Sequence, residues 1–308
     1  MLRDRLAALR RETGVVGATA GPHRKDPERL ALEGPPMVGE IGVARAPLAE
    51  RLARISGNRA ASRTRGLDAL LRITGARAVT DDLHVVEWRR ALPFLHGHVP
   101  VGETGRTQVA VPLRRGASVL VPLDRVLFLD TETSGLAGGT GTFVFLLGLA
   151  QVADGDLVVR QFLATGFAGE PAMLDILRDH VVAANCVVTF NGKSFDMPLL
   201  KTRYALNRLA HPFEGKPHGD LLHAARRLLR SGWPDCRLRT TESRALGFER
   251  VDDLPGSEVP AAWQRWLTCA DTEAVPRILD HNREDLLSLA AIVSLLNSCE
   301  SRAPLFQR

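Results

Sequence analysis

The stretch VLFLDTETSGL, residues 126–136, decides the fold of this chain. Its first five residues are an apolar run that ends in Asp130, a pattern typical of a strand buried inside a sheet. Glu132 stands two positions later, and residues two apart on a strand point to the same side of the sheet. The sequence therefore predicts a buried strand that presents two carboxylates together at its end.

Regular patterns around this stretch predict an α/β protein. Residues 143–152 and 157–164 are two further apolar runs joined by the turn 153–156, which predicts a meander of three strands. Further strands are expected at 83–88, 107–113 and 186–190. Helices are expected at 67–73, 171–181, 194–209, 220–230 and 281–299. Strands interleaved with helices in this way are typical of the α/β class.

Two more acids are candidates for the same site. One follows a predicted strand and its turn, and the other lies at an apolar position of a predicted helix. Asp196 follows the strand CVVTF through the turn NGKSF, and Asp285 lies among leucines in the last helix. A carboxylate at an apolar position is costly to bury unless it is paired or binds a metal ion. Oxygen ligands of this kind suit a hard divalent cation. Alternatively, Asp196 caps its helix, and Asp285 pairs with Arg283 or Lys193.

Composition excludes several classes of protein. The chain has 308 residues, of which 45% are hydrophobic and 24% charged, as in a soluble globular protein. No apolar run approaches the roughly 20 residues of a membrane-spanning helix, and the first residues lack the apolar core of a secretory signal. The four cysteines are far apart and form no C-x-x-C pair, so we expect a cytoplasmic protein without disulfides.

Charge is distributed unevenly along the chain. Lys and Arg exceed Asp and Glu by eight in residues 1–120, and the acids exceed the bases by three in residues 121–308, which gives the net charge of +5. We therefore divide the chain into a basic, partly flexible N-terminal extension over 1–120 and a second, acidic domain over 121–308 that contains the four candidate acids. A basic arm beside an acidic domain predicts an anionic partner, such as nucleic acid, and a cation site.

Three motifs carry a resemblance to a known family. FLDTETSGL, TFNGKSFDMPLL and HNREDLLSL resemble the three motifs of the DEDD exonucleases in the ribonuclease H-like superfamily. Residues 235–267 resemble the insert of the bacterial YprB-like group of predicted exonucleases. The resemblance covers about 120–297. It implies a ribonuclease H-like fold, in which a central mixed sheet that begins with an antiparallel meander is flanked by helices on both faces.

The resemblance also implies an activity and its cofactors. It implies a metal-dependent 3′–5′ exonuclease that hydrolyses single-stranded DNA or RNA by a two-metal mechanism, with Mg²⁺ or Mn²⁺ as the ions. Carried over residue by residue, the metal ligands are Asp130, Glu132, Asp196 and Asp285. No membrane partner is expected.

His281 is the candidate for the general base, and its spacing departs from the family pattern. DEDD enzymes carry a Tyr four residues before the last Asp or a His five residues before it, whereas His281 stands four residues before Asp285. Residues four apart share a helix face, and the unperturbed pKa of a histidine, near 6.5, suits proton transfer at neutral pH. The alternative is a histidine at the helix start, satisfied by the backbone or by Asp280.

Substrate contacts are predicted on both sides of the acids. Thr133 and Leu136 match positions that contact the terminal nucleotide in relatives. Asn191 and Lys193 lie on the turn before Asp196, where Asn191 either fixes the turn or binds substrate. The remaining candidates are Arg226 and Arg237, in a run of arginines that forms either a phosphate track or a solvated surface.

Three tryptophans and Asp220 need separate interpretations. Trp233 is able to stack on a base, while Trp263 and Trp266 have helical spacing and are expected in the core. Asp220 begins a predicted helix and is expected to cap it.

Two other functions stay open at this point. One is an endonuclease of the same fold, which the acid-bearing strand does not distinguish from an exonuclease. The other is a nucleic-acid-binding protein without catalytic activity, against which stands the completeness of the acid set.

Overall fold

The structure is a computed structural model that describes residues 66–102, 107–113, 116–135, 141–229 and 232–301. Residues 1–65 of the predicted basic extension, and the predicted substrate contact Leu136, lie outside these described residues. Within the described residues, no helix combines the length and apolar character needed to cross a membrane.

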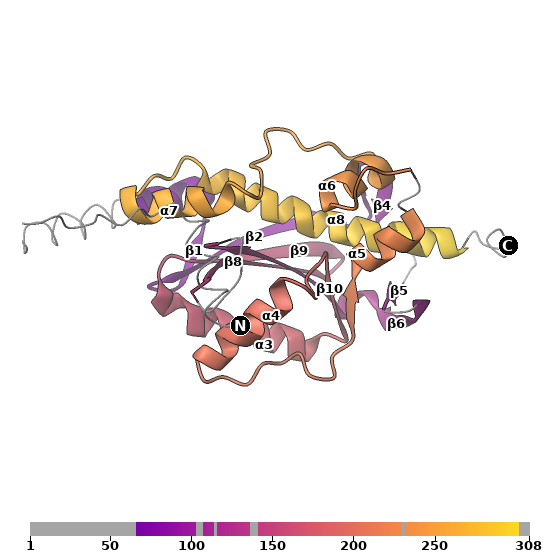
Figure 1. Ribbon diagram of the computed structural model, residues 1–308, viewed down its shortest axis with the longest axis horizontal. Coiled ribbons are helices and arrows are strands. Elements are labelled where there is room, and N and C mark those ends of the chain that lie inside the picture. The colour runs from indigo at the N-terminus through magenta and orange to yellow at the C-terminus, as the bar shows by residue number, and fades with distance from the viewer. Residues whose placement is uncertain (1–65, 103–106, 114–115, 136–140, 230–231, 302–308) are drawn as a thin grey trace, which may run out of the picture. The chain divides into compact units, whose positions relative to one another are not determined.

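A seven-stranded mixed sheet forms the centre of the fold (Figure 1). Its strand order is β1-β2-β9-β8-β7-β10-β11. The strands are β1 (Arg77–Thr80), β2 (Leu83–Ala91), β7 (Val126–Thr133), β8 (Val144–Ala153), β9 (Asp156–Ala164), β10 (Cys186–Thr189) and β11 (His218–Asp220). β7, β8 and β9 form the predicted antiparallel meander, while β10 pairs in parallel with both β7 and β11.

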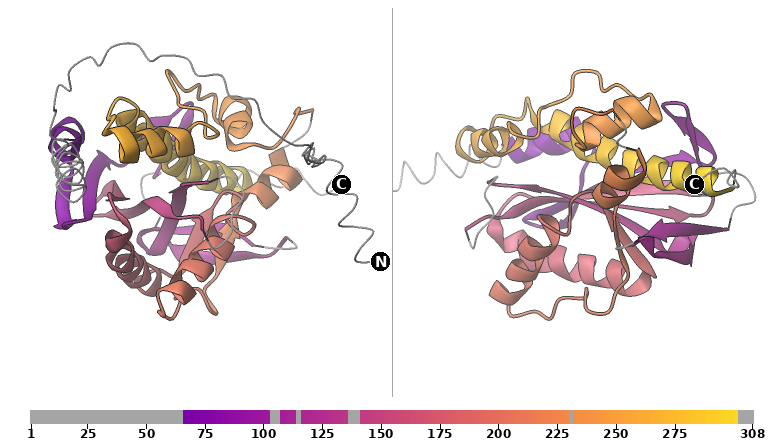
Figure 2. Two further views of the ribbon diagram at one scale, coloured as in Figure 1. Left: turned by 60° about the vertical axis from the view of Figure 1, so that its left-hand side comes forward. Right: turned by 45° about the vertical axis from the view of Figure 1, so that its right-hand side comes forward.

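Helices cover both faces of this sheet, as the ribbon views show (Figures 1 and 2). One face carries α3 (Glu170–Ala183) and α4 (Asp196–Leu206). The other side carries α5 (Leu221–Ala224), α6 (Leu238–Thr241), α7 (Val259–Cys269) and the long α8 (Val275–Ser301). The predicted class, a central mixed sheet flanked by helices, is confirmed.

Several short elements complete the described fold. Residues 66–74 are helical. Two hairpins, β3 (Phe94–His96) with β4 (Val99–Val101) and β5 (Gln108–Pro112) with β6 (Ser118–Pro122), contact α8. 3₁₀ turns occur at Leu123–Arg125 and Phe167–Gly169, and π turns occur at Ala225–Leu229 and Glu242–Leu246.

The alternation of side chains along β7 divides the core into two layers. Leu127 and Leu129 pack in a cluster that contains Leu177 of α3, whereas Phe128 packs in one that contains Leu286 of α8. All five side chains are almost completely buried. Because successive strand residues point to opposite faces, this pattern also decides which helix each polar residue at the end of β7 meets.

The sheet extends into the segment that the sequence analysis assigns to the N-terminal extension. β2 pairs antiparallel with β9 along its whole length, from Leu83 opposite Ala164 to Ala91 opposite Asp156. The central sheet therefore crosses the predicted boundary between residues 120 and 121. The alternation in residues 83–88 predicts a strand, but a local pattern carries no information on which distant strand it joins.

Two local features differ from the expectations at helix ends. α8 begins at Val275 rather than at His281, so this histidine lies inside the helix and not at its start. The helix expected at 220–230 is a single turn, α5, that continues as a π turn. The Asp220 side chain accepts a hydrogen bond from the Leu222 amide at 3.1 Å, which confirms its capping role.

Trp263 and Trp266 lie in the core, as expected from their spacing. They are 1% and 4% exposed. The Trp263 ring stacks on Phe145 of β8, with ring centroids 4.3 Å apart. α7 is therefore attached to the sheet by aromatic packing rather than held for contact with a ligand.

Candidate active site

The four predicted acids and His281 line one pocket of about 410 Å³ at the end of β7. The acids come from three elements: Asp130 and Glu132 from β7, Asp196 from the start of α4, and Asp285 from α8. The other lining residues are Thr131, Phe190, Asn191, Phe195 and Gly256. The structure thus brings together groups that are far apart in the sequence.

Side-chain alternation places the end of β7 between α4 and α8. The Thr131 hydroxyl donates a hydrogen bond to Oδ1 of Asp196, at 2.5 Å. One position earlier, Oδ2 of Asp130 accepts a hydrogen bond from Nδ2 of Asn282 on α8, at 2.7 Å. Neighbouring residues on a strand point to opposite faces. The strand end therefore contacts a polar group from the helices on each side of the sheet.

A buried hydrogen-bond network that the sequence analysis missed fixes the position of the Asp130 side chain. Nε2 of Gln161 donates to Oδ1 of Asn282 at 2.9 Å and to the Leu279 carbonyl at 2.7 Å. Gly148 of β8 lies opposite Asp130 in the sheet register, and a Cβ there would be 2.2 Å from Oδ1 of Asn282. The signal in the sequence is an isolated glycine inside the apolar run FVFLLGLA, which is typical of a close approach to the backbone.

Burial and mutual repulsion dominate the electrostatics of the cluster. Burial, followed by the charge of Asp285, raises the pKa of Asp130 and of Glu132 well above the usual range. Burial raises the pKa of Asp196 to about 6, although the hydrogen bond from Thr131 lowers it. Like charges in a buried site favour the protonated form or the binding of a cation. A set of carboxylate oxygens without sulfur fits a hard divalent ion.

Arg250, which the sequence analysis also missed, contacts this cluster from the segment that resembles the YprB-like insert. Its Nη2 lies 2.5 Å from Oδ1 of Asp285 and 2.5 Å from Oε1 of Glu242, and its Nε donates to Oε2 of Glu242 at 2.8 Å. Only 4% of the Arg250 side chain is exposed. The expected alternative, that Asp285 pairs with Arg283, is wrong, because Arg283 pairs with Asp280 at 2.9 Å.

These contacts explain why the acids do not form a metal-binding geometry. Among the described residues, no group of three or more His, Cys, Asp or Glu side chains is arranged to hold a metal ion. Asp285 faces Arg250, Asp196 accepts from Thr131 and Asp130 accepts from Asn282. The chemistry of the donor set fits divalent cations, but each of these carboxylates points at a protein partner.

His281 is oriented by a second residue of the same segment, Asp253. Nδ1 of His281 lies 2.7 Å from Oδ1 of Asp253, whose side chain is 8% exposed. Nη1 of Arg250, which only donates, lies 3.3 Å from the same Nδ1. The contact with Asp253 is the shorter one and, because an ionised carboxylate only accepts hydrogen bonds, it favours a proton on Nδ1 and leaves Nε2 as the acceptor nitrogen. Nε2 faces Gly256, where an added Cβ would be 3.7 Å away. The free nitrogen thus faces the carboxylate pocket, which Gly256 also lines.

The turn that carries Asn191 and Lys193 is fixed by Asp220. Oδ1 of Asp220 accepts from the Asn191 amide at 2.7 Å, and Oδ2 accepts from the Lys193 amide at 3.0 Å. Asn191 has a φ of 64°, a left-handed conformation that asparagine tolerates better than most residues. Asp220 therefore both caps α5 and shapes the approach to Asp196.

The predicted substrate contacts are distributed over several places. Asn191 lines the carboxylate pocket, but Lys193 lines a separate pocket that also contains Lys201 and Lys216. The Thr133 hydroxyl donates to the Gly135 carbonyl at 2.8 Å, and Thr133 does not line the carboxylate pocket.

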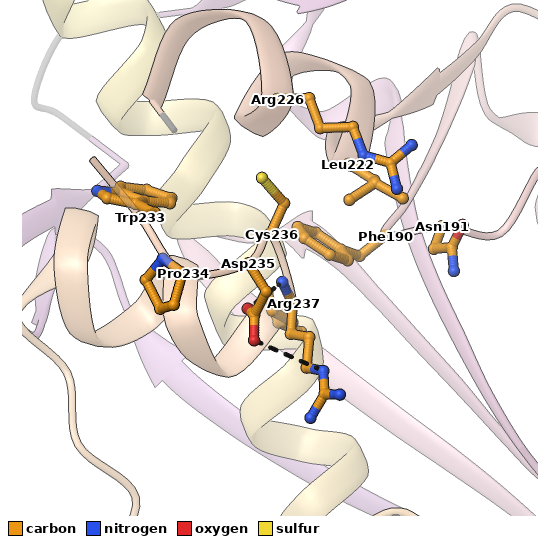
Figure 3. Close-up of a pocket in the computed structure, with 10 residues that line it drawn as sticks. Phe190, Asn191, Leu222, Arg226, Trp233, Pro234, Asp235, Cys236 and Arg237 are labelled. Carbon is orange, nitrogen blue, oxygen red and sulfur yellow. Dashed lines mark hydrogen bonds and ion pairs between the residues drawn. The ribbon is translucent and has the colours of Figure 1, made fainter. Parts of the chain in front are cut away.

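Arg226 and Arg237 line a second pocket, which adjoins the carboxylate pocket. Both line a pocket of about 670 Å³ that shares Phe190 and Asn191 with the carboxylate pocket (Figure 3). Both predicted arginines therefore line one pocket that adjoins the pocket of the acids.

Comparisons with known proteins agree with this fold. The profile of the RNase_H superfamily matches residues 127–297, which contain all four acids and His281. Over 185 residues the chain is 36% identical to YprB, an uncharacterized protein of Bacillus subtilis (strain 168). That match covers 59% of this chain and 45% of YprB, so the chain spans less than half the length of this relative.

A similarity to a solved structure was also found. The family B DNA polymerase from the hyperthermophilic archaeon Pyrobaculum calidifontis matches with a TM-score of 0.42 and 17% sequence identity. The match covers 75% of this chain and 30% of that one.

Proposed function

The chain belongs to the RNase_H superfamily, and we propose that it is a metal-dependent 3′–5′ exonuclease that hydrolyses phosphodiester bonds of single-stranded DNA or RNA. One observation carries the proposal: four carboxylates from β7, α4 and α8 line a single pocket together with a histidine. The resemblance of the three acid-bearing motifs to the DEDD exonucleases supports the direction of cleavage.

The four acids are the proposed ligands of two divalent cations, Mg²⁺ or Mn²⁺. When bound, such ions activate water and stabilise the charge that develops on the phosphoryl group. Asp130, Glu132 and Asp196 have raised pKa values because burial and repulsion destabilise their charged forms. A cation that neutralises the cluster therefore gains a large favourable interaction. For Asp285 to join the ligand set, its carboxylate must separate from Arg250.

His281 is the proposed general base. Its Nε2 accepts the proton from the attacking water, which is a typical role for a histidine near neutral pH. Asp253 is the proposed positioning residue, because its carboxylate accepts the proton on Nδ1 and stabilises the imidazolium ion that forms. His281 and Asp285 are four positions apart on α8, so both side chains project from one helix face.

We propose that the polar residues predicted to contact substrate bind the nucleic-acid strand and position it at the carboxylates. Asn191 lies between the carboxylate pocket and the pocket of Arg226 and Arg237. Thr133 is close in sequence to the acids of β7. We propose that Lys193 acts on phosphates away from the reacting bond, since it lines a different pocket with other lysines.

An end-labelled strand tests the proposed function. A 5′-labelled single-stranded oligonucleotide, as DNA and as RNA, is incubated with the purified protein and Mg²⁺, Mn²⁺ or EDTA, with Asp130→Asn as the contamination control. We expect a metal-dependent ladder that shortens from the 3′ end and is absent in the variant. Opening of a circular single strand would instead identify an endonuclease, and salt-sensitive binding without cleavage would identify a binding protein.

A further inference from the structure

A second pocket adjoins the one that contains the carboxylates. It has a volume of about 670 Å³, which is within the range of pockets that bind small molecules. Phe190 and Asn191, directly after β10, line both pockets. Other residues that line the second pocket are Leu222, Arg226, Trp233, Asp235, Cys236 and Arg237. The two pockets therefore share part of their lining, so a strand bound at the carboxylates has this pocket next to it.

Two exposed guanidinium groups give this pocket its positive charge. Arg226 comes from the π turn after α5, and Arg237 immediately precedes α6, so each is held by a different element. Nε of Arg237 lies 3.7 Å from Oδ2 of Asp235, in an exposed ion pair. Exposed pairs of this kind contribute little to stability. A phosphate group is therefore able to replace Asp235 as the partner of Arg237.

The Asp235 carboxylate has hydrogen-bond partners besides the Arg237 side chain. Its Oδ1 accepts hydrogen bonds from the Arg237 amide at 3.0 Å and from the Thr240 hydroxyl at 2.5 Å. These bonds shape the turn before α6. The carboxylate therefore keeps its partners when the Arg237 side chain turns to a ligand.

An aromatic ring provides the second kind of contact. Trp233 lies at one end of the pocket, and Arg226 and Asn191 lie at the other (Figure 3). Unlike Trp263 and Trp266, Trp233 is only half-buried. Nucleic-acid bases stack on such rings with little sequence preference, whereas the base faces inside a duplex are already covered by their neighbours. The combination of an indole ring and guanidinium groups thus matches a nucleotide of a single strand.

We propose that this second pocket binds the nucleotide that precedes the one removed from a single strand, with its base on Trp233 and its phosphate between Arg226 and Arg237. The inference rests on the proposed function for the identity of the neighbouring site. It gives a structural reason for an unpaired substrate of any sequence, because stacking and phosphate contacts tolerate any base and require an unpaired strand.

Two substrates of different length test the pocket in the full-length protein. The p-nitrophenyl ester of thymidine 5′-monophosphate carries a nitrophenyl leaving group in place of the preceding nucleotide, so it lacks the base and the phosphate that the second pocket is proposed to bind, whereas an oligothymidylate octamer supplies both. The variants are Trp233→Ala, Trp233→Phe and the double change Arg226→Gln with Arg237→Gln. The control is Arg178→Gln, which removes an exposed, paired arginine of α3 on the other face of the sheet.

For Trp233→Ala, and for the double arginine variant, we expect kcat/KM on the octamer to fall about tenfold or more, the effect of losing one stacked base or its phosphate contacts. Activity on the ester is expected to stay within about twofold of the wild-type value, and Trp233→Phe is expected to retain most activity on the octamer. Equal losses on ester and octamer would overturn the inference, since they would indicate a structural role. Unchanged activity on both substrates would overturn it as well, and would leave the exonuclease intact.

Binding decides the question even where no cleavage occurs. The Kd of a fluorescein-labelled octamer is measured by anisotropy in EDTA, which removes any metal ion. We expect Trp233→Ala and the double arginine variant to bind the octamer about tenfold more weakly than wild type and Arg178→Gln do, whether or not the ester is hydrolysed. Equal Kd values for all proteins would overturn the pocket. A wild-type protein that binds the octamer but hydrolyses neither of these substrates nor an oligouridylate octamer would contradict the proposed function alone.

Discussion

The guanidinium group of Arg250 lies 2.5 Å from Oδ1 of Asp285, at the edge of a pocket lined by three other carboxylates. The same group also contacts Glu242, whose side chain is completely buried. Breaking a buried ion pair by removing one partner is strongly destabilising, because a charge is left without compensation. The Arg250 guanidinium therefore already neutralises Asp285, and a divalent ion would have to displace it to bind this carboxylate.

The carboxylate cluster should make the metal-free protein less stable than it would be without one of its charges. Asp196 has a pKa of about 6 in the fold, above the usual aspartate value of 3.8, so its charged form is disfavoured by folding. At pH 7.5, above both values, this lowers the free energy of unfolding by at most about 3 kcal/mol. Asp196→Asn is expected to raise the metal-free melting temperature at pH 7.5 and to remove the stabilisation by Mn²⁺.

A thermal melt with and without metal checks this prediction. Wild type should gain about 3 kcal/mol when Mn²⁺ is present at about 100 times its Kd. Asp175→Asn, on the surface of α3, is the control and should retain the full gain. Equal gains in wild type and Asp196→Asn would argue against Asp196 as a ligand.

Arg250 should oppose metal binding while stabilising the fold. Arg250→Gln leaves Glu242 without its cation, so we expect the metal-free protein to lose about 3–5 kcal/mol of stability. The same change releases Asp285, so the gain on adding Mn²⁺ should exceed that of wild type. Arg250→Lys keeps the charge, so its metal-free stability and its gain on adding Mn²⁺ should lie between those of wild type and Arg250→Gln. A smaller metal-induced gain in Arg250→Gln would contradict the competition between the two cations.

The hydrogen bond between Asp253 and His281 should affect catalysis more than binding. Asp253→Asn replaces an acceptor by an amide that is able to donate, which favours the tautomer with a proton on Nε2. We expect kcat to fall about 100-fold, near the effect of His281→Ala, with KM little changed. Asp252→Asn is the matched control, since Asp252 has a φ of 52° and asparagine tolerates such a conformation. An unchanged kcat and pH profile in Asp253→Asn would reject the positioning role.

His96 should make the protein less stable in mild acid. Nε2 of His96 lies 2.9 Å from the Ser288 hydroxyl, which donates to Glu242. Burial, with smaller effects of Arg250 and Arg90, lowers the pKa of His96 to about 4.

The sign of the pH effect follows from these pKa values. Above about pH 6.5, both the folded and the unfolded protein carry a neutral His96, so there is no effect. Between about 6.5 and 4 only the unfolded state binds the proton, and stability falls by about 2 kcal/mol at pH 5. His96→Asn should lose less stability between pH 7.5 and 5 than wild type, and the exposed His98→Asn should lose as much. Equal losses in wild type and His96→Asn would refute this explanation.

Gly148 should be intolerant of any side chain. The methyl group in Gly148→Ala would overlap the Asn282 amide, which in turn holds Asp130. We expect a loss of about 1–3 kcal/mol, typical of overpacking, together with a fall in kcat. Gly141→Ala is the control, because in the described part of the chain no atom beyond its sequence neighbours lies within 4 Å of the added Cβ. A wild-type melting temperature in Gly148→Ala would show that the network adapts.

Much of the fold follows from local pattern. The apolar run before Asp130 and the runs on each side of the turn 153–156 predict the meander, because a strand buried on both faces needs no polar residues. Asp130 and Glu132 end β7, and Asp196 begins α4 after the parallel strand β10, so these three acids meet at the carboxyl ends of the two strands. The fourth acid, Asp285, comes from α8. Local pattern does not identify the partner of β2, since pairing with β9 depends on residues far along the chain.

The residues that surround the acids were not predictable in the same way. Arg250, Asp253 and Asn282 are ordinary polar residues in the sequence, and their roles arise from contacts made over long separations. Gly148 carried a weak signal as a glycine inside an apolar run. Residues 1–65 lie outside the described part of the chain, so the basic extension stays a prediction. The cytoplasmic location also stays a prediction.

The first product released from a 3′-labelled single strand tests the central claim most directly. Wild type and Asp130→Asn, purified in parallel, are incubated with the strand in Mn²⁺ or in EDTA, and the labelled product is sized at low conversion. The account predicts that wild type releases a labelled mononucleotide with Mn²⁺ and nothing in EDTA, and that the variant releases none. A labelled oligonucleotide as the first product, or equal release by the variant, would contradict it.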